Sequence, residues 1–240
     1  MSDYELVALL PMKAHSERIS GKNFREFAGK PLFRWMLDRL MATPEIDRVI
    51  INTDARKILE SHGVTETEKL SIRDRSEMLC GDMVSMNAIL EDDLRAVASR
   101  MYLMTHTTNP LLSVDTIRRA IEAYRSGLDE GRCDSLFSVT KYQSRFYTDS
   151  GKALNHDPSR LLRTQDLPPL FEENSNLYLF NRTSFDSTRA RIGSRPMMFE
   201  SPFLESFDID DADGWNLAEV VAKDRLSDVS PSAIADADPS

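Results

Sequence analysis

The loop after the first apolar run carries groups that bind phosphate. Residues 5–10 are a short apolar run that ends at Pro11, which predicts a buried strand. Lys13, Ser16, Arg18 and Lys22 follow it, and ligands of open α/β sheets bind at the carboxyl ends of strands. Lysine, hydroxyl and backbone amide groups can neutralise and bond phosphate oxygens. The loop therefore suits a triphosphate, although its spacing alone fits an ordinary charged surface loop equally well.

A second cluster near the C-terminus could hold a metal ion. A strand is predicted over residues 206–210, and residues two apart in a strand share a face. Asp208 and Asp210 would then point the same way, which suits a hard divalent cation that also carries substrate phosphates. Asp211 would point elsewhere and is expected to cap the next helix. Taken alone, a solvated acidic turn is the simpler interpretation of this run.

Two further groups are ambiguous on residue type alone. Arg75 and Asp82 precede a helix predicted over 84–98, where they could contact a base or merely cap that helix. His106 follows a strand predicted over 101–105 and could act at a site, although a lone histidine is more often structural.

The sequence motifs of several other enzyme classes are absent from this chain. The chain has no Gly-x-Gly-x-x-Gly or Walker A loop, no zinc-ligand spacing and no Gly-x-Ser-x-Gly elbow. An NAD-dependent dehydrogenase and a nucleophilic hydrolase are therefore disfavoured.

Composition and charge restrict the class of protein. Of the 240 residues, 41% are hydrophobic and 29% are charged, as in globular proteins. The net charge of −9 equals the excess of 11 acidic over 2 basic residues within 200–240, so a broad basic surface for nucleic acid is not expected. No apolar run approaches the roughly 20 residues that span a bilayer, so no membrane partner is expected. The N-terminus does not resemble a secretory signal, and two cysteines without clustering suggest a reducing, cytoplasmic location.

Strand and helix patterns alternate along the chain, which predicts an α/β fold with a mostly parallel sheet and helices on both faces. We expect a single domain over 1–229, a protruding lid or interaction arm at about 143–169, and a flexible tail over 230–240. The predicted strands are 5–10, 48–53, 101–105, 135–140, 176–180 and 206–210, and the predicted helices begin at Pro31 or cover 55–62, 84–98, 116–125 and 214–225.

Short motifs follow one another in a definite order along residues 6–222. They are Pro11-x-Lys13-x-x-Ser16, Gly21-Lys22-Asn23, Gly29-Lys30-Pro31-Leu32, Asn52-Thr53-Asp54, residues 75–82 with Ser85, Thr108-Asn109-Pro110, Asp134-Ser135, Ser138-Val139, residues 163–168, residues 174–178, Ile192-Gly193 and Phe207-Asp208-Ile209-Asp210. Taken in order, these motifs resemble the acylneuraminate cytidylyltransferases (CMP-sialic acid synthetases), with the CMP-KDO synthetases as relatives.

The resemblance implies a Rossmann-like nucleotidyltransferase that moves CMP from CTP to an acidic acceptor with the help of Mg²⁺ and releases pyrophosphate. It also implies a homodimer in which the 143–169 arm crosses to the partner subunit. By position, the residues expected in catalysis are Lys13, Arg18, Lys22 and Asp210; for CTP, Ser16, Asn23, Arg75, Asp82 and Ser85; for the acceptor, His106, Lys141, Arg163, Asn174 and Tyr178; and for the metal, Asp208 and Asp210.

The chain departs from the family pattern mainly near the acceptor. Lys13 replaces the usual arginine, Ala14 and His15 replace two glycines, Glu17 replaces a lysine and His106 replaces a glutamine. The residues expected to bind the nucleotide thus largely match the family pattern. The acceptor could be an acylneuraminate-like or other ulosonic acid, or a different small acid such as a phosphonate. A non-catalytic nucleotide-binding protein on the same fold is the alternative from another class.

Overall fold

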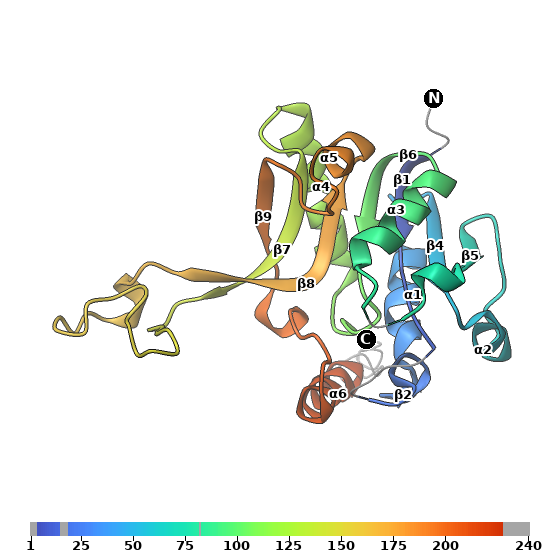
Figure 1. Cartoon of the computed structure of the whole chain (residues 1–240). Helices are drawn as coiled ribbons and strands as arrows, with labels where there is room; N and C mark the ends of the chain where they lie inside the picture. Colours follow the sequence, from blue (N-terminus) through green and yellow to red (C-terminus); the bar gives the residue numbers. More distant parts are fainter. Residues whose placement is uncertain (1–3, 15–18, 82, 228–240) are drawn as a thin grey trace, which may run out of the picture.

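The computed structural model describes residues 4–14, 19–81 and 83–227, and a 7-stranded sheet lies at its centre (Figure 1). The strand order is β5-β4-β1-β6-β8-β7-β9. The bounds are β1 Tyr4–Leu9, β4 Arg48–Thr53, β5 Leu70–Asp74, β6 Ser99–Met104, β7 Ser135–Tyr142, β8 Leu170–Phe180 and β9 Pro196–Glu200. A small separate hairpin consists of β2 Glu26–Phe27 and β3 Lys30–Pro31.

The sheet is mostly parallel. Every neighbouring pair is parallel except the two that involve β8, which runs antiparallel to both β6 and β7. The β7–β8 pairing shifts register between Phe137 and Val139, and opposite this shift Ser175 adopts a left-handed backbone with φ 57°. A bulge of this kind redirects side chains, and here it lies beside the main cavity.

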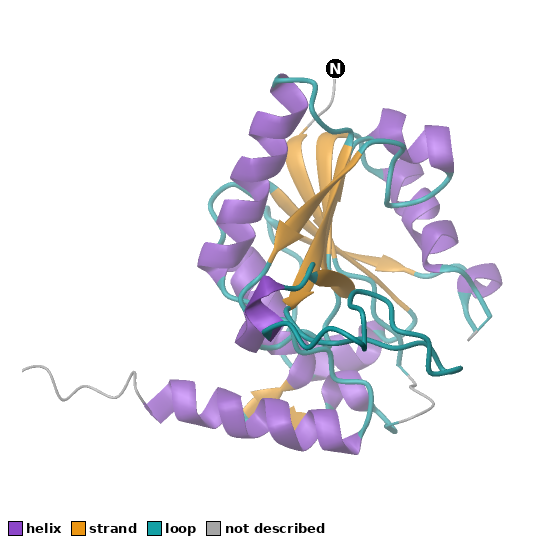
Figure 2. Ribbon diagram, turned by 90° about the vertical axis from the view of Figure 1, so that its left-hand side faces the viewer, coloured by secondary structure: helices purple, strands orange, loops and turns teal. Residues whose placement is uncertain are grey.

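Helices cover both faces of the sheet (Figure 2). One core contains apolar residues of the helices Leu32–Ala42 and Val114–Asp129, and the other contains residues of the helices Met86–Ala96 and Arg182–Thr188. The Rossmann-like α/β arrangement expected from the sequence is therefore confirmed. The helix bounds are α1 Leu32–Ala42, α2 Arg56–Ser61, α3 Met86–Ala96, α4 Val114–Asp129, α5 Arg182–Thr188 and α6 Ala212–Ser227. Short 3-10 turns are η1 Lys22–Phe24, η2 Glu77–Leu79, η3 Thr164–Asp166 and η4 Phe203–Glu205.

A third apolar cluster attaches α6 to the body of the protein. Phe27 and Trp215 pack edge to face with ring centroids 5.3 Å apart, and the Trp35 indole donates to the Phe27 carbonyl at 2.9 Å. Ile209 is fully buried in the same cluster. This packing holds the segment that leads into α6 against the carboxyl edge of the sheet.

Most predicted elements are found, with one clear error. The strand over 48–53 has the predicted bounds, and the helix after Ser113 begins with its hydroxyl accepting from the Thr116 amide. The strand predicted over 206–210 is wrong, because β9 already occupies the open edge of β7 and the segment has no strand to pair with. Its Ile209 amide instead donates to the Thr108 carbonyl in a loop. The sequence patterns missed β5, α5 and β9.

Beyond the sheet, β7 and β8 continue as a long ribbon that carries the arm (Figure 1). Residues 143–169 lie between the two strands and expose several apolar side chains, including Leu161 at 90%, Leu154 at 56% and Tyr147 at 52%. The predicted tail over 230–240 lies outside the described residues. Within the described part of the chain, no helix is both long and apolar enough to cross a membrane.

Candidate active site

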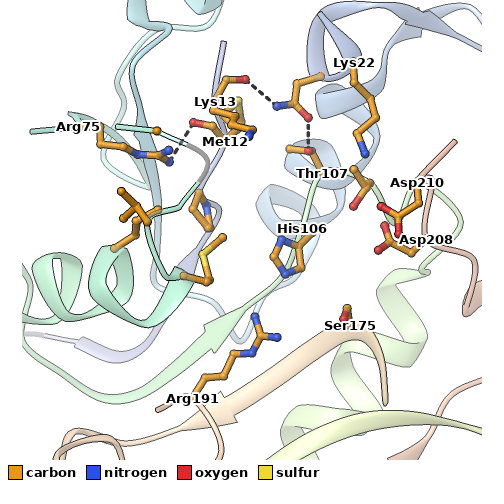
Figure 3. Close-up of a pocket in the computed structure, with 17 residues that line it drawn as sticks. Met12, Lys13, Lys22, Arg75, His106, Thr107, Ser175, Arg191, Asp208 and Asp210 are labelled. Atoms are coloured by element: carbon orange, nitrogen blue, oxygen red, sulfur yellow. Dashed lines mark hydrogen bonds between the residues drawn. The ribbon is translucent and has the colours of Figure 1, made fainter. Parts of the chain in front are cut away.

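A cavity of about 410 Å³ opens at the carboxyl edge of the sheet (Figure 3). Strands β1, β5 and β6 end at it, where ligands of open α/β sheets bind. Its volume is typical of a small-molecule site. The wall contains Pro11, Met12, Lys13, Lys22, Asn23, Arg75, Gly81, Val84, Met86, Ile89, His106, Thr107, Thr108, Ser175, Arg191, Asp208 and Asp210.

Asn23 joins two of the loops that form this wall. Its Nδ2 donates to the Lys13 carbonyl at 2.8 Å, and its Oδ1 accepts from the Thr107 hydroxyl at 2.6 Å. Gly21, with φ 60°, supplies the left-handed turn that begins η1. Asn23 therefore orders the β1 and β6 loops, and Lys13 lines the cavity as predicted.

Lys22 links the first loop to the acidic segment. Its side chain is buried, and Nζ donates to the Ile209 carbonyl at 2.5 Å, across 187 residues of sequence. The peptide carbonyl that it contacts lies between Asp208 and Asp210. The predicted phosphate-binding and metal-binding clusters are thus one site. Ser16 and Arg18, predicted for the same loop, lie outside the described residues.

Asp208 and Asp210 both line the cavity although they are not in a strand (Figure 3). The buried Ile209 between them points into the third apolar cluster, so its two neighbours reach the opposite side. Asp211 caps α6, as predicted, and its Oδ1 accepts from the Gly214 amide at 2.8 Å.

This donor set fits a hard cation that shares its coordination with substrate. Among the described residues, no group of three or more Asp, Glu, His or Cys side chains could enclose a metal ion. Mg²⁺ does not require such a cage, because it is usually held by one or two carboxylates together with substrate phosphates and water.

Arg75 lines the cavity in a fixed orientation. Its Nε donates to Asn52 Oδ1 at 2.9 Å, and its Nη2 donates to the carbonyls of Asn52 and Met12 at 2.7 and 3.1 Å. Asn52 in turn donates from Nδ2 to the buried carboxylate of Asp93 at 2.8 Å. Burial raises the pKa of Asp93 to about 6, with hydrogen bonds from Asn52 and the charge of Arg73 opposing it.

Ser85, which was predicted to bind CTP, caps α3, because its hydroxyl accepts from the Asn87 amide at 3.2 Å. Its neighbours Val84 and Met86 line the cavity. Asp82 lies outside the described residues.

His106 is the one predicted acceptor residue in the described cavity wall. Burial, followed by the charges of Arg191 and Lys22, lowers its pKa to about 3. The imidazole is therefore neutral at pH 7, with one nitrogen that donates and one that accepts.

The other four predicted acceptor residues lie elsewhere in this chain. Lys141 is exposed on β7, and Arg163 lies on the arm, where it forms two hydrogen bonds with the Asp166 carboxylate at 2.7 and 3.1 Å. Asn174 is buried, and its amide accepts from Ser138 at 2.6 Å and donates to Ser201 at 2.8 Å. Its side chain therefore stabilises the sheet beneath the cavity.

Tyr178 is fully buried and is not part of the cavity wall, but it contacts Arg191, which is. Its hydroxyl donates to Glu173 and accepts from Arg191 Nη2 at 2.9 Å. Burial raises the pKa of Tyr178 to about 12.

Arg191 and Ser175 in the wall were missed by sequence reasoning. Arg191 directly precedes the Ile192-Gly193 motif, but a single arginine in an irregular segment carries no periodic pattern. Ser175 reaches the cavity only because of the bulge in β8, which no spacing rule predicts.

A basic loop thus meets a carboxylate pair at the carboxyl edge of a mostly parallel sheet, an arrangement that suits a nucleoside triphosphate and its cation. A sequence model of the Cytidylyltransferase family matches residues 7–219, and the chain belongs to this family.

Several curated proteins are similar in sequence. Pseudaminic acid cytidylyltransferase of Campylobacter jejuni is 24% identical over 72% of this chain and 76% of its own. CMP-N,N'-diacetyllegionaminic acid synthase of Legionella pneumophila is 22% identical over 89% of this chain and 94% of its own. N-acylneuraminate cytidylyltransferase of Streptococcus agalactiae is 24% identical over 87% of this chain, which spans only 51% of that longer protein.

Solved structures support the fold. CMP-2-keto-3-deoxy-manno-octonic acid synthetase in complex with CTP superimposes with a TM-score of 0.63 at 15% identity, covering 92% of this chain and 100% of the other. 4-Diphosphocytidyl-2C-methyl-D-erythritol synthase from Anaerococcus prevotii gives a TM-score of 0.66 at 12% identity, covering 92% and 96%.

Proposed function

We propose that this cytidylyltransferase moves CMP from CTP to an acidic acceptor of the ulosonic or acylneuraminate type. The observation that carries the proposal is the convergence of Lys13 and Lys22 with Asp208 and Asp210 in one cavity. The names of the similar proteins support the acceptor class, since each specifies an acid as the group joined to CMP.

The reaction joins an acceptor hydroxyl oxygen to the α-phosphorus of CTP. As that bond forms, the bond from the α-phosphorus to the bridging oxygen breaks, pyrophosphate leaves with the electron pair, and the hydroxyl proton passes to solvent. Catalysis then consists mainly of positioning and of stabilising negative charge as it develops. Lys13 and Lys22 supply fixed positive charge for the phosphate oxygens.

Asp208 and Asp210 would hold Mg²⁺, which when bound supplies Lewis-acid stabilisation of phosphate charge. The hydrogen bond from Lys22 to the Ile209 carbonyl keeps the two carboxylates next to the ammonium that binds the triphosphate. His106 is too weak a base to take the acceptor proton at pH 7, since its pKa is about 3. It acts as a neutral hydrogen-bonding group that orients the acceptor.

We also propose that the protein is a homodimer joined partly by the arm. Leu161 is 90% exposed and Leu154 and Tyr147 are more than half exposed on a single chain. Exposed apolar side chains on a protruding ribbon favour burial against another protein surface.

The activity is tested by measuring pyrophosphate release from CTP, ATP, GTP and UTP with Mg²⁺ and a panel of acids. The panel contains N-acetylneuraminic acid, 2-keto-3-deoxy-manno-octonic acid and 2-aminoethylphosphonate. We expect release with CTP together with at least one ulosonic acid. CTP binding without release for any acid would favour the non-catalytic alternative. Release with the phosphonate alone would contradict the acceptor class but not CMP transfer.

A further inference from the structure

Arg191 holds a fixed positive charge at the end of the cavity that faces away from Lys13 (Figure 3). It lies in the loop between α5 and β9, and its backbone amide donates to the Asn87 side chain of α3 at 3.3 Å. Its side chain is only 20% exposed. The loop therefore presents the guanidinium to the cavity and shields most of it from bulk water.

Tyr178 fixes the orientation of this guanidinium. The Arg191 carbon Cζ lies 3.8 Å from the centroid of the Tyr178 ring, and Nη2 donates to the Tyr178 hydroxyl at 2.9 Å. A guanidinium that is stacked and bonded in this way loses little freedom when it binds a ligand. Nη1 lies 3.9 Å from the Met104 sulfur, which is a weak acceptor. The stronger hydrogen-bonding capacity of this nitrogen is therefore available to a ligand.

The charge of Arg191 is only partly balanced by the protein. Its carboxylate neighbour Glu173 is 3.5 Å away, and its side chain is 42% exposed. An ion pair at such a position is weak. The facing side chain, His106, is neutral and adds no competing charge.

The other charges of the cavity define what Arg191 can bind. Lys22 lies on the same side of the cavity as Asp208 and Asp210, and Lys13 lies at the end away from Arg191, which suits a triphosphate and its cation (Figure 3). An acidic acceptor would be repelled by that triphosphate unless a separate cation held its own anion. The Nη1 group of Arg191, which contacts only the weakly accepting Met104 sulfur among the contacts described above, can donate a charge-assisted hydrogen bond to a carboxylate or phosphonate oxygen.

We propose that Arg191 is the receptor for the acidic group of the acceptor and that it acts from the same subunit as the rest of the cavity. This inference rests on the proposed function. It differs from the assignment of that role to Arg163, which lies on the arm and pairs with Asp166 in its own chain. Tyr178 is then a positioning residue for Arg191.

The test is a steady-state comparison of wild type and Arg191→Met with CTP and the best ulosonic acid of the panel. We expect the KM for the acid to rise roughly tenfold to a hundredfold, because a hydrogen bond to a charged group is worth about 1.5–3 kcal/mol. The KM for CTP should stay within about threefold. The matched control is Arg189→Met, which removes an exposed arginine two residues away that pairs with Glu91. That control should leave both KM values within about twofold.

A second readout separates binding of the anion from a structural role. Wild type should prefer the free acid over its methyl ester, and Arg191→Met should lose roughly tenfold or more of that preference. A merely structural residue would lower both activities in proportion. If the Met variant does not fold, Arg191→Lys keeps the charge and is expected to raise the acid KM several-fold, because lysine lacks the flat guanidinium that Tyr178 stacks on and orients.

Three results would overturn the inference. An unchanged KM for the acid in both Arg191 variants would show that the anion binds elsewhere. Loss of CTP binding in Arg191→Met, measured by calorimetry, would assign Arg191 to the nucleotide. A wild-type enzyme that binds CTP but releases pyrophosphate with none of the acids would overturn the proposed acceptor, and the inference with it.

Discussion

Lys22 donates a 2.5 Å hydrogen bond to the carbonyl of Ile209, the residue between the two carboxylates of the cavity. This contact joins the basic loop after β1 to the acidic segment before α6. Both groups would meet the same triphosphate, one directly and the other through a cation. The two clusters are therefore parts of a single charge arrangement.

The first prediction concerns this contact. Lys22→Met should lower kcat by roughly 10²–10³, the effect seen when a group that stabilises developing charge is removed. Lys30→Met is the control, because Lys30 belongs to the same loop region but pairs with Asp38 on the surface. Steady-state pyrophosphate release measures both. Comparable losses in the two variants would show that general loop charge, not Lys22, matters.

The second prediction separates the two neighbouring aspartates. Asp210→Ala should abolish turnover with little loss of stability, because Asp210 lines the cavity. Asp211→Ala should retain turnover but lose about 1 kcal/mol of stability, because it caps α6. Activity at millimolar Mg²⁺ measures turnover of both variants, and denaturant unfolding measures their stability. Near-wild-type activity of Asp210→Ala would contradict the metal assignment.

The third prediction concerns His106. Because its pKa is about 3 in the ligand-free protein, its ionisation should leave no limb in the pH profile of kcat/KM between pH 5.5 and 8. His106→Gln should keep that profile while changing the ranking of acceptor acids, and the KM for CTP should stay within a few-fold. A variant that loses an acidic limb present in wild type would show that His106 titrates in the working range.

The fourth prediction concerns stability and pH. Burial raises the pKa of Asp93 from 3.8 to about 6, so the folded state binds its proton more tightly than the unfolded state does. The free energy of unfolding of the wild type should therefore fall as pH rises from about 4 to 6. The fall should be up to about 3 kcal/mol relative to Asp93→Asn, which lacks this ionisation. Urea unfolding at pH 4, 5, 6 and 7 measures the difference. A constant difference between the two proteins would contradict the prediction.

The fifth prediction concerns the arm. Light scattering at micromolar concentration should give the mass of a dimer, and replacing residues 144–167 with a short glycine-serine turn should yield monomers. Arg163→Ala should keep the dimer, because its described partner is Asp166 of the same arm. A monomeric wild type would contradict the proposed assembly.

The sequence was most informative where burial alone determines structure. The run at 48–53 is almost wholly buried and forms the predicted strand, and the carboxyl ends of such strands located the cavity. Asp208 and Asp210 were placed on one side by strand alternation, yet the segment is a loop. The prediction succeeded because the fully buried Ile209 turns its neighbours outward in either conformation.

Features that depend on distant contacts could not be predicted in the same way. The edge strand β9 alternates between half-buried and exposed residues and begins with a proline, so its pattern is weak. Arg191 reaches the cavity through its contacts with Tyr178 and Asn87, which only the folded chain brings together. The motif places Asn174 at the acceptor, but its amide is bonded to the hydroxyl of Ser138 in β7 and to that of Ser201 just after β9.

The most direct test of the account is to identify the products of one reaction. The enzyme is incubated with CTP, Mg²⁺ and the acid panel, and the products are analysed by mass spectrometry and ³¹P NMR. The account predicts a CMP conjugate of an ulosonic acid and pyrophosphate in equal amounts. Formation of CMP and pyrophosphate without a conjugate, or of no product from a protein that binds CTP, would contradict it.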